Sequence, residues 1–244
     1  MLRSPREADG IRINAYLAQS GLGSRRSVEA LITGGSVTLN GKTVISLSQR
    51  VNPGHDVVVC DGRKIQARAF EYIMLHKPPG FASTRHDPHA KKTIYDLLPP
   101  AWHHLNYAGR LDMESEGLML LSNDGAWIAS ITHPRHKIDK TYEVEVEGFP
   151  KTESLESAQR GIRNRGEVLT FASARILTTR SRSTRLLIHL NEGRNREIRR
   201  VFKVLGHRVI WLKRIAIGRV QLGLLKKGMS RPLTREEICS LAGD

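Results

Sequence analysis

The sequence predicts an α+β protein in which a small N-terminal module precedes a larger domain with a mainly antiparallel, mixed β-sheet flanked by helices. Apolar and polar residues alternate in "TYEVEVEG" (141–148), which indicates a half-buried strand, and apolar residues recur at helical spacing in "NREIRRVFKVLG" (195–206). The 244 residues fit one medium domain plus a small one. We place the module at residues 10–66 and the larger domain at residues 70–244.

Two helices followed by hairpins are predicted for the N-terminal module. "IRINAYLAQSG" (11–21) sets Ile13, Tyr16 and Leu17 on one helical face. "SRRSVEALITGG" (24–35) has a Ser at its start that can act as N-cap and a Gly-Gly pair that can end the helix. Beyond it, "SVTLNGKTV" (36–44) contains the Asn-Gly pair typical of a two-residue hairpin turn, and "VNPGHDVVVCDGRKI" adds further strand.

Arg25 and Arg26 lie in the first turn of the second predicted helix. Backbone N–H groups at a helix N-terminus favour a phosphate, and two guanidinium groups strengthen that preference. The alternative is a pair of solvated surface arginines. The sequence alone leaves both interpretations open.

In the larger domain, "EYIMLHKPPG" (71–80) and "TRLLIHL" (184–190) are typical of strands, the first closed by a Pro-Pro-Gly turn. Within 141–148, Tyr142 shares its face with the two valines, and the glutamates share the other. "PLTREEICSL" (232–241) predicts a closing helix with a capping box between Thr234 and Glu237.

The helix predicted near 195–206 has two contrasting faces. Its apolar stripe comprises Ile198, Val201, Phe202 and Leu205. The opposite side repeats the same spacing with cations, at Arg196, Arg199, Arg200 and Lys203. We expect Asn195 to cap this helix, Gly206 to end it, and the cationic side to form a row that faces a ligand.

Charge is the strongest global property. The chain has 39 Lys and Arg against 24 Asp and Glu, a formal net charge of +15, which predicts a polyanionic partner. No run approaches the length of a membrane span, and "MLRSPREADG" lacks the apolar stretch of a secretory signal. We therefore expect a cytoplasmic, monomeric protein that binds nucleic acid, with no membrane partner. Cys60 and Cys239 are interpreted as reduced thiols, although a disulfide between them stays open.

Motifs for nucleotide or metal chemistry are missing from the sequence. It contains no GxxxxGK[ST], GxGxxG or GxSxG pattern, and its histidines form no zinc pattern with the cysteines. We expect neither a cofactor nor a metal ion. Carboxylates remain as the candidate catalysts.

The candidate carboxylate is Asp112, in "GRLDMESEGLMLLSNDG" (109–125). It follows an arginine and precedes an apolar run that predicts a buried strand. A neighbouring arginine keeps a carboxylate ionised, so the residue is either a structural ion-pair partner or a catalyst. A glycosidase would need a second acid at a defined distance, and no spacing rule makes Glu114, Glu116 or Asp124 that partner.

The stretch 109–125 closely resembles the catalytic motif of pseudouridine synthases, in the family of the ribosomal small-subunit synthase A and the large-subunit synthases B, E and F. Three further stretches match in order: "HKPPG" (76–80), "KTYEV" (140–144) and "LIHLNEGRNREIRR" (187–200). The N-terminal module resembles the alpha-L RNA-binding motif shared with a small-subunit ribosomal protein. The resemblance covers about residues 11–240.

Two positions depart from the family pattern. Ser115 stands where the family usually has threonine, which keeps the hydroxyl. Asn14 replaces a charged position in the module, which we expect to weaken the module's contact with RNA.

The resemblance implies a reaction that detaches a uracil from its ribose, turns it and rejoins it through a ring carbon, without metal or cofactor. Asp112 matches the essential aspartate, and it must start ionised whether it adds to the sugar, adds to the base or abstracts a sugar proton. Tyr142 matches the tyrosine that stacks on the uracil, and Arg199 matches the arginine that pairs with the aspartate. Arg110 matches the residue that fills the gap left by the flipped base.

The remaining site residues are expected to bind the RNA or shape the pocket. Leu187 and Ile188 are expected to floor the pocket. The RNA contacts are assigned to Arg194, Arg196, Arg200, Arg25 and Arg26.

The expected partner is ribosomal RNA or a ribosomal subunit precursor. "FASTRHDPHAKKTIYDLLP" (81–99) looks more like the B-type members of the family, which modify large-subunit RNA, than the A-type members, which modify small-subunit RNA. We therefore favour large-subunit ribosomal RNA. Two alternatives stay open: a non-catalytic RNA-binding or ribosome-assembly protein on the same fold, and a glycosylase that would release free base.

Overall fold

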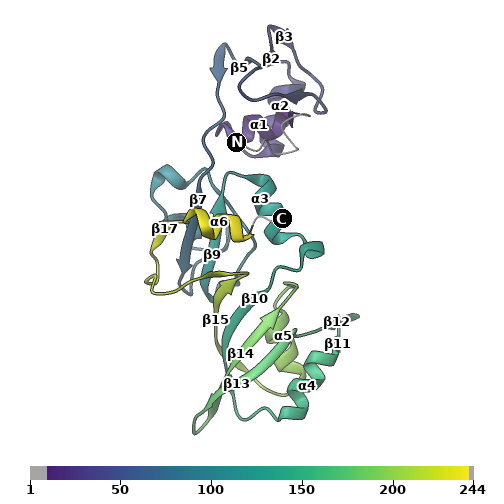
Figure 1. Cartoon of the computed structure of the whole chain (residues 1–244), viewed down its shortest axis with the longest axis vertical. Coiled ribbons are helices and arrows are strands. Elements are labelled where there is room, and N and C mark those ends of the chain that lie inside the picture. Colours follow the sequence, from purple (N-terminus) through teal and green to yellow (C-terminus); the bar gives the residue numbers. More distant parts are fainter. Residues whose placement is uncertain (1–9, 242–244) are drawn as a thin grey trace. The chain divides into compact units, whose positions relative to one another are not determined.

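The structure is a computed structural model that describes residues 10–241. The chain divides into two compact units, which Figure 1 shows in one view. One unit holds the described residues up to Phe70 together with Asn123–Gly125, and the other holds Glu71–Ser122 and the residues from Ala126 onward. Helices and mainly antiparallel sheets occur in both, which confirms the predicted α+β class.

The first unit packs two helices beside small sheets. Helices α1 (Ile13–Gln19) and α2 (Arg25–Thr33) bury one face each. The four-stranded sheet has the order β3-β2-β5-β6, and a separate pair joins β1 and β4. The strands are β1 (Ile11–Arg12), β2 (Val37–Leu39), β3 (Lys42–Thr43), β4 (Arg50–Val51), β5 (Val58–Cys60) and β6 (Arg63–Ile65).

The turn and cap signals of this unit are confirmed. Ser24 caps α2, with its Oγ accepting from the backbone N–H of Ser27 at 3.1 Å. Asn40–Gly41 joins β2 to β3 with φ values of 51° and 80°, and Asp61–Gly62 joins β5 to β6 with φ values of 46° and 75°. Paired left-handed residues are what a tight hairpin turn requires.

Asn14 joins the two helices of this unit. Its side chain is 6% exposed, donates to Glu29 Oε1 at 3.0 Å and accepts from Arg25 Nη2 at 3.4 Å. The weaker RNA contact expected from this residue stays a prediction.

The second unit is built on a nine-stranded sheet, counted over the described residues. The order is β13-β14-β10-β15-β9-β7-β17, with β16 on β15 and β8 on β9 (Figure 1). The strands are β7 (Tyr72–Lys77), β8 (Asn106–Tyr107), β9 (Glu116–Ser122), β10 (Lys140–Glu147), β13 (Ser173–Thr179), β14 (Ser183–Leu190), β15 (Val209–Ile217), β16 (Val220–Gln221) and β17 (Ser230–Pro232). Among these described strands, only β15 and β9 pair in parallel.

Helices and short turns surround this sheet. They are α3 (Gly125–Thr132), α4 (Thr152–Arg160), α5 (Glu197–Val204) and α6 (Arg235–Leu241), with 3-10 turns η1 (Ile94–Leu97), η2 (Pro100–Trp102) and η3 (Pro134–His136). A small hairpin pairs β11 (Ile162–Asn164) with β12 (Glu167–Leu169). None of the helices in residues 10–241 has the length and apolar character needed to cross a membrane.

Two hydrophobic cores cover the two faces of the middle of this sheet. One core receives α4 and α5, and the other receives α3 and α6. β9 supplies both cores, because Met119 and Leu121 face the first while Leu118 and Leu120 face the second. Every residue of β9 is buried, as its continuous apolar run predicts. Each fully buried leucine contributes about 1.5–3 kcal/mol, so this strand is a rigid support for the loop before it.

The predicted alternation along β10 is confirmed. Tyr142, Val144 and Val146 are buried in the first core. On the opposite face, Glu145 accepts from Ser183 and Arg185 at 2.7 and 3.2 Å. This register places the phenol of Tyr142 on the side of the sheet that carries α5.

The start of α5 differs from the prediction. Arg196, not Asn195, occupies the cap position, with a left-handed φ of 49° and no side-chain cap bond. The carboxylate of Glu197 instead accepts from the backbone N–H of Arg194 at 3.1 Å, which turns the chain just ahead of the helix. Gly206 ends the helix as predicted, with a φ of 82°.

The closing helix α6 has the predicted capping box. The backbone N–H of Thr234 donates to Glu237 Oε2 at 2.8 Å, and the backbone N–H of Glu237 donates to Thr234 Oγ1 at 3.2 Å.

Candidate active site

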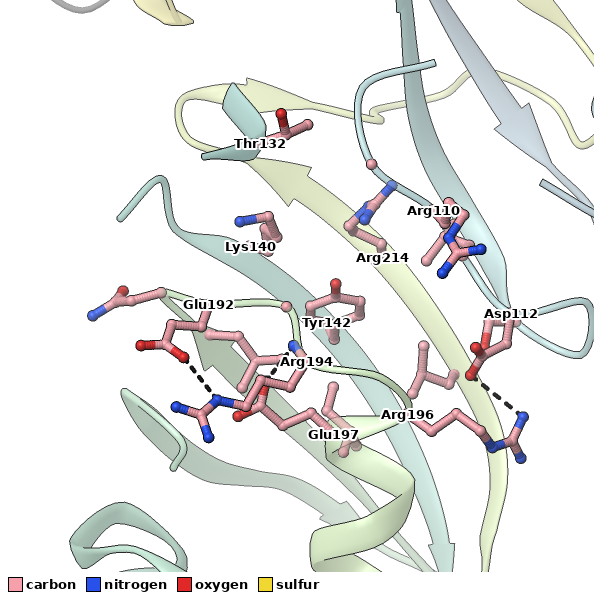
Figure 2. Close-up of a pocket in the computed structure, with 18 of the residues that line it drawn as sticks. Arg110, Asp112, Thr132, Lys140, Tyr142, Glu192, Arg194, Arg196, Glu197 and Arg214 are labelled. Carbon is pink, nitrogen blue, oxygen red and sulfur yellow. Dashed lines mark hydrogen bonds and ion pairs between the residues drawn. The ribbon is translucent and has the colours of Figure 1, made fainter. Parts of the chain in front are cut away.

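A pocket of about 250 Å³ lies where β10 and β15 meet the loop before β9 and the segment before α5. Figure 2 shows its side chains converging from these four segments. Asp112, Tyr142 and Arg199 all line it, so the fold brings together the three residues expected to be catalytic. Arg110, Arg194 and Arg196 also line it.

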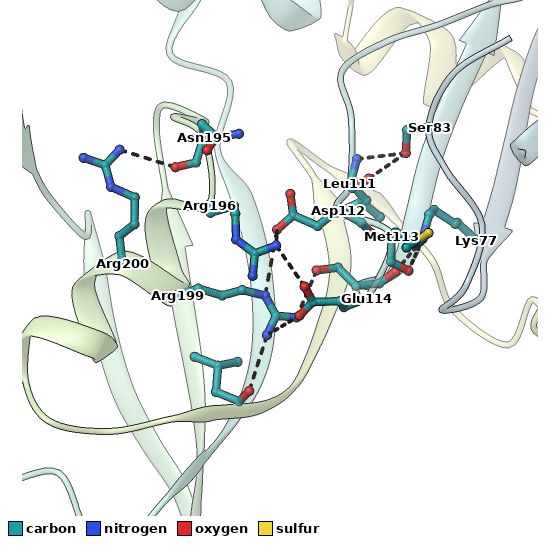
Figure 3. A network of polar contacts seen from close by, with 12 residues as sticks. Lys77, Ser83, Leu111, Asp112, Met113, Glu114, Asn195, Arg196, Arg199 and Arg200 are labelled. Carbon is teal, nitrogen blue, oxygen red and sulfur yellow. Dashed lines mark hydrogen bonds and ion pairs between the residues drawn. The ribbon is translucent and has the colours of Figure 1, made fainter. Parts of the chain in front are cut away.

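The backbone of the Asp112 loop is held by a buried lysine at the end of β7. Lys77 is fully buried, and its Nζ donates to the carbonyl oxygens of Pro78, Asp112, Met113 and Ser115 at 3.1, 3.1, 3.2 and 2.7 Å. Burial lowers the pKa of this ammonium to about 8, so it is still mainly charged at pH 7. The cation therefore fixes the loop from behind while the Asp112 carboxylate points away from it (Figure 3).

Further hydrogen bonds hold the same loop. Ser83 Oγ donates to the carbonyl of Leu111 at 2.7 Å and accepts from the N–H of Leu111 at 3.2 Å (Figure 3). The N–H of Gly80 donates to the carbonyl of Met113 at 2.8 Å. The main chain on both sides of Asp112 is thus fixed in place before any substrate binds.

Gly117 lets this loop come close to β15. Its φ is 120°, and a Cβ at this position would lie 2.2 Å from the carbonyl oxygen of Arg214. A side chain would therefore force β9 away from β15 at the parallel pairing Arg214↔Gly117.

Two carboxylates share two arginines at the mouth of the pocket. Asp112 Oδ2 lies 3.5 Å from Arg196 Nη1 and 3.8 Å from Arg199 Nε. Glu114 is closer, with Oε1 3.0 Å from Arg196 Nη1 and Oε2 3.3 Å from Arg199 Nη1 (Figure 3). The hydrogen bond from Arg196, and then the charge of Arg199, lower the pKa of Glu114.

The longer distances leave the Asp112 carboxylate available. Both exceed normal hydrogen-bond lengths, and Arg199 Nε has no hydrogen-bond partner within residues 10–241. The oxygens of Asp112 therefore stay free to meet a substrate. Ser115 supports the arrangement, because its Oγ accepts from Arg199 Nη2 at 3.3 Å.

The other acids near Asp112 in sequence have different positions. Glu116 is 1% exposed and pairs with Lys227 Nζ at 2.6 Å, away from the pocket. Asp124 belongs to the first unit and does not line the pocket. Of these three acids, Glu114 is the one that pairs with the same arginines as Asp112, while the other acids that line the pocket are Glu192 and Glu197.

Tyr142 lies on the inner wall, where its ring is 7% exposed. Leu190, Ile198 and Leu212 are the apolar residues beside it that line the pocket.

The expectation that Leu187 and Ile188 floor the pocket is wrong. Ile188 is the cross-strand partner of Tyr142 on β14 and is buried in the core below it. Leu187 points to the opposite face, because neighbouring residues of a strand alternate.

The cations expected to form one row near α5 instead pair with carboxylates from different segments. Arg200 is turned away from the pocket, with Nη1 2.6 Å from Glu167 and Nε donating to Asn164 Oδ1 at 2.9 Å. Arg194 lines the pocket and pairs through Nε with Glu192 at 2.9 Å. Carboxylates from neighbouring segments neutralise these arginines, which a helical periodicity cannot reveal.

The described residues give two results on metal and thiol chemistry. Over residues 10–241, no group of three or more His, Cys, Asp or Glu side chains could hold a metal ion. Cys60 is buried and Cys239 is exposed, and both are free thiols.

The sequence reasoning missed two cations of the site, Lys77 and Arg214. Lys77 stands in "HKPPG", at the end of an apolar strand, where a lone lysine is a usable signal. Arg214 is 2% exposed within β15 and lines the pocket. Its alternation with Leu212 could have suggested that it shares a face with the pocket.

On a mixed sheet, one pocket brings together an aspartate carboxylate near two arginines and a tyrosine ring, and comparison with known families identifies the class of protein. The model of the RNA pseudouridylate synthase family matches residues 71–203, more than half of the chain, and the S4 domain model matches residues 11–57. The chain belongs to the RNA pseudouridylate synthase family. The resemblance carried by the four motifs and the N-terminal module is thereby confirmed.

Several relatives match over nearly the whole chain. The chain is 37% identical to ribosomal large subunit pseudouridine synthase B of Bacillus subtilis, with 93% of each chain covered. It is 33% identical to ribosomal small subunit pseudouridine synthase A of Escherichia coli, covering 95% of this chain and 100% of the relative. Among solved structures, a crystal structure of a pseudouridylate synthase matches with a TM-score of 0.66 and 30% identity, covering 95% of this chain and 100% of that chain.

Proposed function

We propose that this protein converts one specific uridine of ribosomal RNA to pseudouridine, with large-subunit ribosomal RNA as the favoured substrate. The observation that carries the proposal is the placement of Asp112. Its carboxylate lies 3.5 and 3.8 Å from two arginines, and it lines the same pocket as the ring of Tyr142. The relatives named above act on ribosomal RNA, according to their names.

The reaction requires the target base to leave the RNA helix. Extrusion costs a few kcal/mol, and stacking on an aromatic ring returns about 1–3 kcal/mol. Tyr142 supplies that ring, and exposed Arg110 at the pocket mouth fills the gap in the RNA. The pocket then encloses uracil with Leu190 and Leu212 beside the ring.

Asp112 initiates the isomerisation in its ionised form. The N1–C1′ bond breaks, the uracil turns, C5 bonds to C1′, the proton on C5 is lost, and N1 gains a proton. Arg199 and Arg196 lie beside the Asp112 carboxylate, and the Lys77 cation holds its backbone while the base turns. Tyr142 is placed to assist the final deprotonation.

The first unit provides a second RNA contact. Arg25 and Arg26 are exposed at the N-terminus of α2, where backbone N–H groups favour phosphate. We assign to them the docking of a neighbouring RNA helix. The protein acts as a cytoplasmic monomer on ribosomal RNA or on a ribosomal precursor particle.

Large-subunit RNA is favoured by residues 81–99, which resemble the B-type members. The relatives include both specificities, so the test uses both RNAs. Unmodified small- and large-subunit transcripts would be incubated with the protein, and pseudouridine would be mapped by carbodiimide labelling and primer extension. Asp112→Asn, which keeps the size of the side chain, is the matched control.

We expect one new stop in the large-subunit RNA that the Asp112→Asn variant does not produce. A stop in the small-subunit RNA alone would overturn the favoured substrate and keep the enzyme. Partly assembled ribosomal particles would be tried next if neither transcript reacts. RNA binding without modification of any of these would favour a binding or assembly protein, and released free uracil would favour a glycosylase.

A further inference from the structure

Arg214 is a buried cation with unused hydrogen-bonding capacity in the wall of the pocket. Its side chain is 2% exposed, and Nε donates to the carbonyl of Leu118 at 2.8 Å. Nη2 has no hydrogen-bond partner in residues 10–241, and none of the ion pairs among those residues includes Arg214. A buried charge without a partner is costly, so such a group is expected where a ligand completes it.

Lys140 lines the same pocket from β10, two residues before Tyr142 and on the same side of the strand. Its Nζ donates to the carbonyl of Ile138 at 2.9 Å and forms no ion pair within the described chain. Arg214 is the cross-strand partner of Tyr142 on β15, so both cations stand beside Tyr142 in the pocket wall. Burial, and then the charge of Arg214, lower the pKa of Lys140, while the charges of Asp139 and Glu197 oppose this shift.

The pocket is therefore electrostatically polarised. The Asp112 carboxylate lies at one end (Figure 2). The phenol hydroxyl of Tyr142 points toward the other end, where Lys140 and Arg214 lie (Figure 2). Glu192 and Glu197 also line the pocket, but Glu192 pairs with Arg194, and Glu197 accepts from the backbone N–H of Arg194. A ligand that fills this pocket needs a neutral ring beside Tyr142 and an anionic group at the cationic end.

We propose that Arg214 and Lys140 together bind a phosphate group that flanks the target nucleotide. The proposal rests on the proposed function and names the group that anchors the flipped nucleotide. A phosphate carries the full negative charge that two adjacent cations require, and it accepts charge-assisted hydrogen bonds from guanidinium and ammonium groups. A uracil carbonyl is neutral and leaves both charges uncompensated.

A purely structural role for Arg214 explains less of the geometry. The bond to Leu118 uses only Nε and ties β15 to β9. It leaves Nη2 unpaired and gives no reason for a second cation, the partly buried Lys140, in the same pocket wall. The two interpretations differ in one measurable respect. Only phosphate binding predicts that removing the charge of one specific RNA phosphate weakens binding of the RNA.

The first experiment changes the RNA and leaves the protein intact. An RNA fragment containing the mapped uridine is synthesised with a neutral methylphosphonate at its 5′ or its 3′ phosphate. Single-turnover kinetics give the half-saturating enzyme concentration and the maximal rate. We expect one of the two substitutions to raise the half-saturating concentration about tenfold or more, with a smaller effect on the maximal rate. A methylphosphonate at a distant phosphate is the control.

The second experiment uses Lys140→Met and Arg214→Met with the same RNAs. Each variant should raise the half-saturating concentration for the natural RNA about tenfold, and the sensitive methylphosphonate should then add little, as expected for groups that touch each other. Arg214→Lys should recover part of the affinity. Lys151→Met, at an exposed position before α4, is the matched control.

Lys140→Met keeps the proposal testable if Arg214→Met does not fold. Its fold should be preserved, because Lys140 is only partly buried and donates to only one carbonyl. The proposal is overturned if neither methylphosphonate weakens binding by the wild type, or if the full penalty persists in Lys140→Met. If the wild type makes no pseudouridine in the natural RNA, the proposed function fails and this inference fails with it.

Discussion

The ammonium of Lys77 lies 2.7 Å from the carbonyl oxygen of Ser115 and is fully buried. This hydrogen bond joins the end of β7 to the loop that presents Asp112. A cation without a carboxylate partner holds the loop here, through backbone oxygens alone. The position of the Asp112 carboxylate therefore depends on a residue that does not line the pocket.

Replacing Lys77 with Met should lower both stability and activity. Several buried carbonyls lose their donor, and each unsatisfied group costs about 1–3 kcal/mol, so we expect a loss of about 2–4 kcal/mol in unfolding free energy. Urea denaturation would measure it. Single-turnover rates at a temperature where the variant is folded should still fall, because the Asp112 loop is no longer fixed. A folded variant with the wild-type rate would contradict this role.

The contribution of Lys77 to stability should also depend on pH. Its pKa is about 8 in the folded protein and 10.5 for an ordinary lysine, so between these values the unfolded chain binds more protons. The unfolding free energy of the wild type should rise from pH 8 to pH 10.5 relative to that of Lys77→Met. Urea titrations of both proteins across this range test the difference, and parallel curves would contradict the assignment.

Glu114→Gln should slow the reaction without unfolding the protein. Glu114 is the closer partner of Arg196 and Arg199, so its loss lets both arginines close on Asp112 and occupy its oxygens. We expect about a tenfold lower single-turnover rate and a stability change below about 1 kcal/mol, since the side chain of Glu114 is 55% exposed. Glu156→Gln, which breaks an exposed pair with Arg160, is the control. An unchanged rate would show that Glu114 only neutralises the arginines.

Two variants can test the contributions of the Tyr142 ring and the Tyr142 hydroxyl separately. Tyr142→Phe keeps the stacking surface and should keep RNA affinity, with a slower release of pseudouridine product if the hydroxyl assists deprotonation. Tyr142→Leu loses stacking worth about 1–3 kcal/mol and should weaken binding of the flipped substrate by roughly 5- to 150-fold. Filter binding and single-turnover rates separate the two, and equal behaviour of both variants would argue against stacking.

Charge reversal of Arg25 and Arg26 should weaken RNA binding and reduce its salt dependence. The slope of log affinity against log salt should fall by about 1 for each phosphate that the variant no longer binds. Arg63→Glu with Lys64→Glu, on the β5–β6 hairpin of the same unit, is the charge-matched control. An unchanged slope in the Arg25 and Arg26 variant would show that these residues do not contact RNA phosphates.

Much of the fold could be predicted from local patterns. The alternation along β10, the apolar stripe of α5 and the Asn-Gly turn of the first unit each specify their own element, and each is observed. Errors arose where the outcome depends on contacts between distant segments. Glu197 displaced Asn195 at the start of α5, because a carboxylate could reach the backbone ahead of the helix.

The candidate site was predictable only in part, for the same physical reason. Motifs brought Asp112, Tyr142 and Arg199 to attention, and the fold places them around one pocket. The pairing of Arg200 with Glu167, and the burial of Arg214, depend on strand order and register that no local pattern encodes. The prediction that Leu187 and Ile188 floor the pocket was wrong for two reasons. Ile188 is the cross-strand partner of Tyr142 and is buried in the core, and Leu187 points to the opposite face of the sheet.

The parallel pairing of β9 with β15 has a consequence for the chemistry. Asp112 belongs to the half-sheet of β7 and β9, and Tyr142 belongs to the half-sheet of β10, β14 and β15. Those halves are joined at Lys213↔Glu116 and Arg214↔Gly117, where the strands touch because Gly117 has no side chain. The Asp112 carboxylate and the Tyr142 ring therefore stand on opposite sides of a narrow seam, which the missing Cβ of Gly117 allows.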